Sequence, residues 1–140
     1  MIETAFNTQD LPPGERFAYW NAMTDRSLCP TLISSDHAND FRATLRNLDF
    51  GAVQVSIPGM PSLRSARTPK LIRKSDPELY NVALDPRGTM KVSHVGRDLV
   101  LRPRDLVVYS SSHPFDARVT AGEQGFAQLV EHLGNRPRSR

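Results

Sequence analysis

Hydrophobic residues near the start of the chain follow a helical period. Phe17, Trp20, Met23 and Thr24 fall at helical spacing, with Trp20 three or four positions from each of the others. This spacing predicts a helix over residues 13–28 with one apolar face. The prolines that open it suit a first helical turn, because proline lacks a backbone N–H that this turn leaves unbonded. A face with Phe and Trp requires an apolar surface, so we expect the helix to plug or flank a sheet.

From residue 30 onward the period changes to two. Apolar and polar side chains alternate strictly over residues 41–46, as in a strand with one buried face. Turn signals rich in Pro, Gly and Asp separate the strand candidates, which are residues 31–35, 41–50, 53–57, 63–74, 79–84, 90–95, 98–101 and 106–111. Short strands at intervals of about ten residues predict a mainly β fold, an antiparallel barrel, jelly roll or sandwich.

The last segment returns to a helical period. Phe126, Leu129, Val130 and Leu133 fit a short amphipathic C-terminal helix over residues 123–133, with Gly134 as its stop. We therefore expect one structural domain in three parts: residues 1–29 with the packing helix, residues 30–119 as the barrel, and residues 120–140 as a short helix and basic tail.

Composition narrows the function classes. The 140 residues suit a single domain, and the net charge of +3 equals the three arginines of residues 136–140, so a general nucleic-acid surface is not indicated. The single cysteine, Cys29, implies no disulfide. No apolar run suggests a signal peptide or a membrane span, so we expect a cytoplasmic chain.

Several segments, in order along the chain, resemble the AraC-binding-like domain family. They are residues 11–17 with Trp20 and Met23, then residues 40–46, 51–56, 67–80, 96–109 and 111–115. The resemblance covers residues 10–118. It implies a cupin-like barrel that senses a small molecule or mediates dimerisation, and that is normally fused to a C-terminal pair of helix-turn-helix motifs.

Two departures from the family stand out. Arg104 occupies a turn position where the family usually has glycine, and a left-handed backbone there would cost arginine about 1 kcal/mol, so we expect a different local turn. After about Val119 the resemblance ends and no helix-turn-helix region follows, so the chain is expected to lack the DNA-binding half. Relatives carry a pairing helix in this position, which makes the predicted C-terminal stripe a candidate dimerisation surface.

Four residues are candidates for contact with a ligand: His94, His113, Tyr80 and Arg73. His94 shares strand parity with two apolar residues, so it is either a hydrogen-bonded histidine at the barrel rim or a polar group in a pocket. Tyr80 shares a face with Val82 and Leu84, which favours a core position over a ligand contact.

Arg73 belongs to a basic strip, which consists of Arg64, Arg67, Lys70, Arg73 and Lys74. A solvated strand surface is favoured for the strip, with an anionic ligand or nearby DNA as alternatives.

No catalytic residue, metal site or cofactor is expected. A cupin enzyme holds its metal through closely spaced histidines, whereas His37, His94, His113 and His132 are scattered singly. Convergence of His94 and His113 in space stays open, although a firm site requires a third ligand. Cys29 has no base near it in the sequence, which indicates an inert buried or half-buried thiol.

These observations favour a non-enzymatic sensing or dimerisation domain of an AraC-type transcription regulator. Expected partners are a small-molecule effector and a second copy or a related regulator, with no membrane. The alternatives are a small cupin-type enzyme and a dimerisation partner that titrates full-length regulators. Specific DNA binding by this chain alone is not expected, since no helix combines a groove-reading face with basic flanks.

Overall fold

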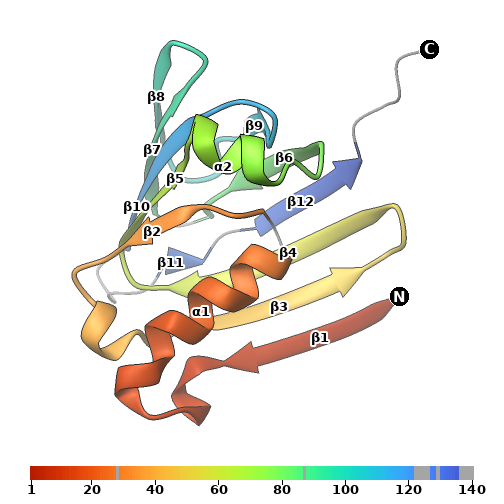
Figure 1. Ribbon diagram of the computed structural model, residues 1–140. Coiled ribbons are helices and arrows are strands. Elements are labelled where there is room, and N and C mark those ends of the chain that lie inside the picture. The colour runs from red at the N-terminus through yellow and green to blue at the C-terminus, as the bar shows by residue number, and fades with distance from the viewer. Residues whose placement is uncertain (28, 87, 122–126, 129, 136–140) are drawn as a thin grey trace.

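The predicted strands form two antiparallel sheets with the core between them (Figure 1). The computed structural model describes residues 1–27, 29–86, 88–121, 127–128 and 130–135. The larger sheet has the order β1 (Ile2–Asn7), β3 (Thr44–Asp49), β4 (Val53–Met60), β12 (Val130–Asn135), β6 (Leu79–Leu84) and β9 (Val107–Ser110), and β11 (Ala127–Gln128) pairs with β4. The smaller sheet has the order β2 (Leu32–Ser34), β5 (Leu63–Arg67), β10 (Phe115–Thr120), β7 (Thr89–His94) and β8 (Arg97–Leu101).

The predicted N-terminal helix is α1 (Pro13–Ser27), and it packs through the predicted stripe. Trp20 is 1% exposed. The ring centroids of Phe17 and Phe41 lie 5.1 Å apart, and those of Trp20 and Phe6 in β1 lie 6.0 Å apart. Two short 3-10 turns, η1 (Thr8–Asp10) and η2 (Ala38–Asp40), lie beside the helix, and Arg16 binds the carboxylate of Asp40 in η2. Aromatic contacts thus hold the helix against the larger sheet, and the ion pair joins the helix to η2.

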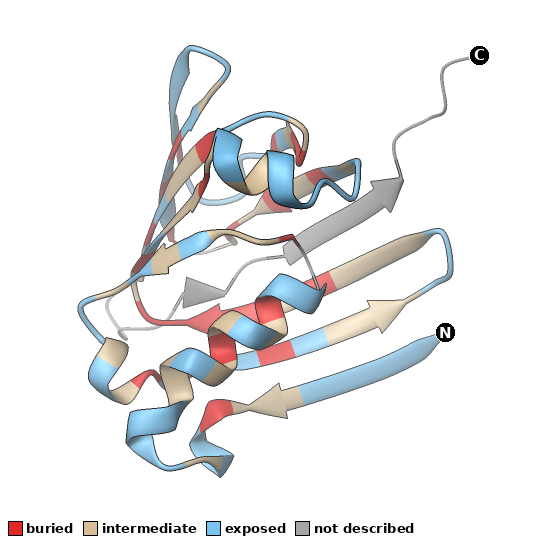
Figure 2. Cartoon of the chain, viewed as in Figure 1, coloured by how far each residue is buried: buried red, intermediate tan, exposed pale blue. Residues whose placement is uncertain are grey.

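The alternation over residues 41–46 is the clearest link from sequence to packing. Phe41, Ala43 and Leu45 are buried, whereas the polar residues between them are exposed. Figure 2 shows the buried residues where α1 and the strands meet, and exposed residues over the β7–β8 hairpin and much of the second helix. A mainly β architecture of two antiparallel sheets with an N-terminal helix is therefore confirmed.

The strand expected over residues 63–74 is half wrong. It stops at the end of β5, and residues 69–74 form the short helix α2 (Pro69–Lys74). The hydroxyl of Thr68 caps this helix by accepting a hydrogen bond from the Leu71 N–H, and Pro69 opens the first turn. No element was predicted for β1 or β10, and β11 and β12 lie where a helix was predicted.

The predicted C-terminal helix is wrong. Part of its span is strand, since β11 pairs with β4, and β12 pairs with β4 on one side and β6 on the other. Hydrogen bonding to two neighbouring strands outweighs a local helical pattern, because propensity is a weak determinant beside tertiary context. The spacing that makes a stripe on a helix makes none on a strand, so Val130 and Leu133 in β12 do not belong to a helical stripe. Phe126 and Leu129 lie outside the described residues.

The turn at Arg104 keeps the conformation that favours glycine. Arg104 has φ +72°, so the expectation of a different turn is wrong. Its N–H donates to the Asp85 carbonyl at 2.9 Å, and the Asp105 carboxylate accepts from the Arg102 N–H at 2.9 Å. These bonds hold the turn in spite of the side chain. Neither helix in the described part of the chain has the length and apolar character that a membrane crossing needs.

Candidate functional site

A cavity of about 80 Å³ lies inside the barrel, between the two sheets. Strand alternation builds its walls, because every second residue of a strand faces the same side. On β6 these residues are Asn81 and Ala83, and on β7 they are Met90 and Val92. The other strands add mainly apolar side chains, among them Met60, Leu63, Val107, Tyr109, Phe115 and Val119.

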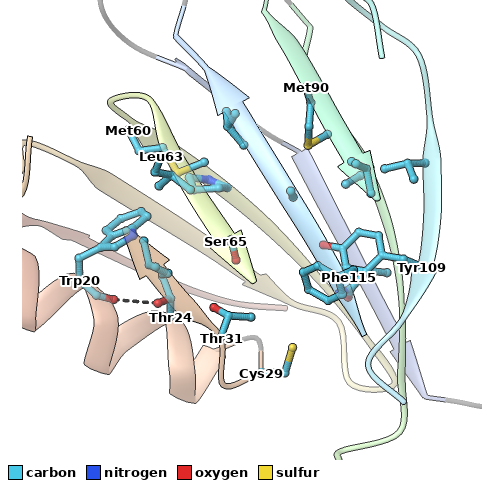
Figure 3. A pocket seen from close by; sticks show the side chains of 18 residues that line it. Trp20, Thr24, Cys29, Thr31, Met60, Leu63, Ser65, Met90, Tyr109 and Phe115 are labelled. Carbon is cyan, nitrogen blue, oxygen red and sulfur yellow. Dashed lines mark hydrogen bonds between the residues drawn. The ribbon is translucent and has the colours of Figure 1, made fainter. Parts of the chain in front are cut away.

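The helix α1 and the segment after it line one side of the cavity. Trp20 and Thr24 come from α1, and Cys29 and Thr31 follow it (Figure 3). In this view Trp20 lies on one side, and Phe115 lies across the cavity from it. The hydroxyl of Thr24 donates to the Trp20 carbonyl at 2.9 Å, so this polar group is satisfied within the helix. The helix therefore both plugs the barrel and contributes to its cavity.

Two buried polar atoms of lining residues have no hydrogen-bond partner among the described residues. They are the indole Nε1 of Trp20 and the carboxamide Oδ1 of Asn81. Trp20 is 1% exposed and Asn81 is 2% exposed, so water outside the barrel does not reach these side chains freely. An indole N–H only donates, and a carboxamide oxygen only accepts. Trp20 and Asn81 thus provide at least one donor and one acceptor in the lining, beside its hydroxyl groups.

The described residues that line the cavity carry no ionisable acid or base of the Asp, Glu, Lys, Arg or His type. Its polar side chains in this set are hydroxyls, one thiol, one indole and one carboxamide. Such a surface can bind an apolar body and direct one or two hydrogen bonds. Cys29 is buried, as expected for it, and lies in the lining.

The two histidines among the candidate site residues do converge. The ring centroids of His94 and His113 lie 6.1 Å apart, with their planes at 70°. Burial, with a smaller contribution from nearby His113, lowers the pKa of His94 below its ordinary value of 6.5. The Nε2 atom of His94 is buried and has no partner within the described structure. In the described residues no third His, Cys, Asp or Glu joins the pair to form a metal-binding group, and neither histidine lines the cavity.

The other two candidates, Tyr80 and Arg73, lie away from the cavity. Tyr80 is 39% exposed, so the core position favoured for it is wrong. Alternation correctly put it on the face of Val82 and Leu84, but that is the outer face of β6. The inner face carries Asn81 and Ala83 instead. Arg73 is an exposed residue of α2.

The predicted basic strip is not one surface. Arg67 is 1% exposed, and its guanidinium donates to three backbone carbonyls, those of Pro30, Ser75 and Ser111, at 2.7–2.8 Å. Arg64 is paired with Asp116 on the neighbouring strand β10. The strip therefore divides into a buried structural arginine, an ion pair, and the exposed cations of α2.

Sequence reasoning missed Asn81 as a site residue. It stands between Tyr80 and Val82 in a strand that otherwise reads as apolar. A single carboxamide in such a strand was the available signal, because buried amides are kept where a partner satisfies them. Trp20 was expected in the core, which is confirmed, but its role in lining a cavity was not predicted.

A match to a known family covers most of the chain. The AraC-binding-like domain family matches residues 20–137. The match continues past Val119, so the resemblance does not end there as expected. The reason is structural, because β12 is an inner strand of the larger sheet and not an appendage to the barrel.

Two curated relatives match at the level of sequence. An uncharacterized protein in the nit 5′ region of Bacillus sp. (strain OxB-1) is 26% identical over 133 residues, which are 92% of this chain and 49% of that protein. The transcriptional activator NphR of Rhodococcus sp. is 26% identical over 112 residues, 79% of this chain and 33% of that protein. The chain therefore spans half or less of the length of these relatives.

Solved structures agree on the fold. The AraC-like transcriptional activator CuxR superposes with a TM-score of 0.79 at 20% identity, over 96% of this chain and 47% of that chain. A Cupin_2 domain of an XRE family transcriptional regulator from Enterobacter cloacae gives a TM-score of 0.50 at 14% identity, over 69% of this chain and 98% of that one. At these identities the likeness establishes a cupin-like fold.

Proposed function

The chain belongs to the AraC-binding-like domain family, and from this premise we propose that it is a non-enzymatic regulatory domain whose small-molecule effector binds in the cavity inside the barrel. The observation that carries the proposal is the pair of unpartnered buried polar atoms, on Trp20 and Asn81, in the walls of one cavity. Both side chains come from elements that hold the barrel together, so a bound molecule would contact the core of the domain.

The stabilisation available to a ligand in this cavity supports the proposal. Filling a core cavity is worth about 24 cal/mol per Å³, so about 80 Å³ corresponds to about 2 kcal/mol. Each buried polar atom without a partner costs about 1–3 kcal/mol more. These costs are large beside a net stability of about 5–15 kcal/mol for a domain. A ligand that fills the cavity and pairs both atoms recovers them.

The chain carries its own reporter for this test. Trp20 is the only tryptophan, and it lines the cavity. We expect the effector to change the emission of Trp20 and to raise the melting temperature of the domain as its concentration rises, because a ligand bound only to the native state stabilises that state. A library of small molecules screened by both readouts provides the measurement.

A matched pair of variants locates the binding. Ala83→Leu adds three carbons inside the cavity, whereas Ala18→Leu makes the same change on the exposed side of α1. Hits from the screen should lose their effect in Ala83→Leu and keep it in Ala18→Leu. Hits that act equally on both variants would place binding elsewhere and refute the proposal.

We also propose that the domain acts in the cytoplasm by pairing, with a second copy or with a related regulator. The edge strands β8 and β9 support this, since Val100 is 69% exposed and Val108 is 61% exposed. Sedimentation velocity should show a dimer that Val108→Asp weakens, and a monomer at high micromolar concentration would contradict pairing with itself. Alone, the chain should show no sequence preference among DNA duplexes in fluorescence anisotropy at about 150 mM salt. No specific observation in the described residues favours the cupin-type enzyme.

A further inference from the structure

We infer that the effector is a compact, neutral, largely apolar molecule that carries one hydrogen-bond acceptor and one donor. This inference rests on the proposed function and names the class of ligand for the same cavity. It follows from the charge, the surface and the unpaired atoms of the lining.

The lining excludes a charged ligand on electrostatic grounds. An ion taken from water into an apolar enclosure is strongly disfavoured unless an opposite charge or several hydrogen bonds replace its hydration. The described lining residues supply no such charge. Free carboxylates, phosphates and amines therefore fit this cavity poorly.

The apolar part of the ligand is set by the walls. Met60 and Met90 lie on opposite sheets, and Phe115 adds an aromatic face. Thioether side chains adapt their shape to what they contact, so these walls accept a compact hydrocarbon body of variable outline. Polyhydroxylated molecules would leave most of their own polar groups unpaired against this surface.

The two unpaired atoms define the polar part of the ligand. The Trp20 indole N–H requires an acceptor, such as a carbonyl oxygen, and the Asn81 carboxamide oxygen requires a donor, such as an N–H or O–H. A ligand with both groups satisfies the two protein atoms at once. A ligand with neither leaves both of them unpaired.

The volume of the cavity limits the size of the molecules that can be used as probes. A dry cavity of about 150 Å³ binds benzene, and the cavity here has about half that volume. Suitable probes are therefore propionamide, which has an acceptor and a donor, its ionised counterparts propionate and n-propylamine, and xenon, which is apolar. The first three share a short hydrocarbon body and differ in charge and hydrogen bonding.

The experiment follows the single indole N–H signal by ¹H–¹⁵N NMR during titration with each probe. We expect propionamide to bind at least about tenfold more tightly than propionate or n-propylamine. It should also move the indole N–H signal downfield, because this N–H then donates a hydrogen bond to the carbonyl oxygen of propionamide. Asn81→Leu should weaken the binding of propionamide about tenfold, which corresponds to one lost hydrogen bond. The same variant should keep the affinity for xenon within about twofold. Asn39→Leu makes the same change on an exposed residue of η2 and should alter neither.

The outcomes separate this inference from the proposed function. If neither xenon nor propionamide moves the Trp20 signal, the cavity does not take ligands and the proposed function fails with the inference. If xenon moves it but propionate or n-propylamine binds as tightly as propionamide, the ligand class is wrong and the proposed function stands. Should Asn81→Leu fail to fold, the side-chain amide signals of Asn81 in the wild type replace it. They must shift with propionamide and not with xenon.

Discussion

Replacement of Trp20 by alanine should destabilise the domain more than most single changes. The side chain is 1% exposed, and truncation of a buried Trp to Ala costs about 3–5 kcal/mol. Its ring centroid lies 6.0 Å from that of Phe6 and 5.6 Å from that of Phe41. Each such aromatic pair contributes about 0.5–1.5 kcal/mol to stability, which the variant loses as well. Removal of an indole N–H without a partner returns about 1–3 kcal/mol. The net loss expected for Trp20→Ala is about 4 kcal/mol.

Urea denaturation followed by far-UV circular dichroism measures this loss, since the variant has no tryptophan to report by fluorescence. For a domain of this length the loss corresponds to a melting temperature lower by about 10–15 °C. Trp20→Phe separates the two opposing contributions, because it keeps an aromatic ring and removes the unpaired N–H. We expect Trp20→Phe to stay within about 1 kcal/mol of the wild type. A loss below about 1 kcal/mol for Trp20→Ala would show that the indole is not held in the core, and would refute the packing of α1.

Three further predictions concern features outside the cavity. Arg67→Met leaves three backbone carbonyls without their buried donor and should cost about 3–5 kcal/mol in urea denaturation. Arg64→Met breaks an exposed pair and should cost clearly less. Equal losses would contradict the structural role of Arg67. Arg104→Gly relieves a left-handed backbone and should raise the free energy of unfolding by about 1 kcal/mol, so a lower melting temperature would count against the turn described. Because burial and nearby His113 lower the pKa of His94 in the folded state, the unfolded chain binds more protons between that lowered pKa and 6.5. The free energy of unfolding should therefore fall as the pH falls through this window, and His94→Gln should reduce this dependence on pH. An unchanged dependence in the variant would show that His94 does not cause it.

Elements that local pattern determines were predicted well. The helix α1 begins at the predicted proline, and β6 spans the predicted residues 79–84. Alternation on β6 also sorted its side chains correctly into two sets. The alternation did not determine which of the two sets faces the core. The more apolar set, which contains Tyr80, faces outward. The inner set carries Asn81, a buried polar residue that lines the cavity.

Features fixed by distant parts of the chain were beyond local patterns. Arg67 reads as one charge in a basic run, yet its partners are the carbonyls of Pro30, Ser75 and Ser111, which no spacing connects. The residues of β12 carry a helical period, but their hydrogen bonds go to strands about 50 and 80 positions earlier, as in the pairs Val130 with Leu84 and Gly134 with Val53. Predicting either feature requires the tertiary structure that they help to form.

The place of β12 has a consequence for how the chain acquires its fold during synthesis. Until β12 has left the ribosome, the larger sheet lacks the strand that joins β1–β3–β4 to β6–β9, so β6 and most of β4 each present an unpaired backbone edge. Such edges are templates for pairing with other chains, and contacts so distant in sequence form slowly. The nascent domain should therefore be most prone to aggregation just before its last strand is made. Completion of the sheet by β12 closes both edges in one step.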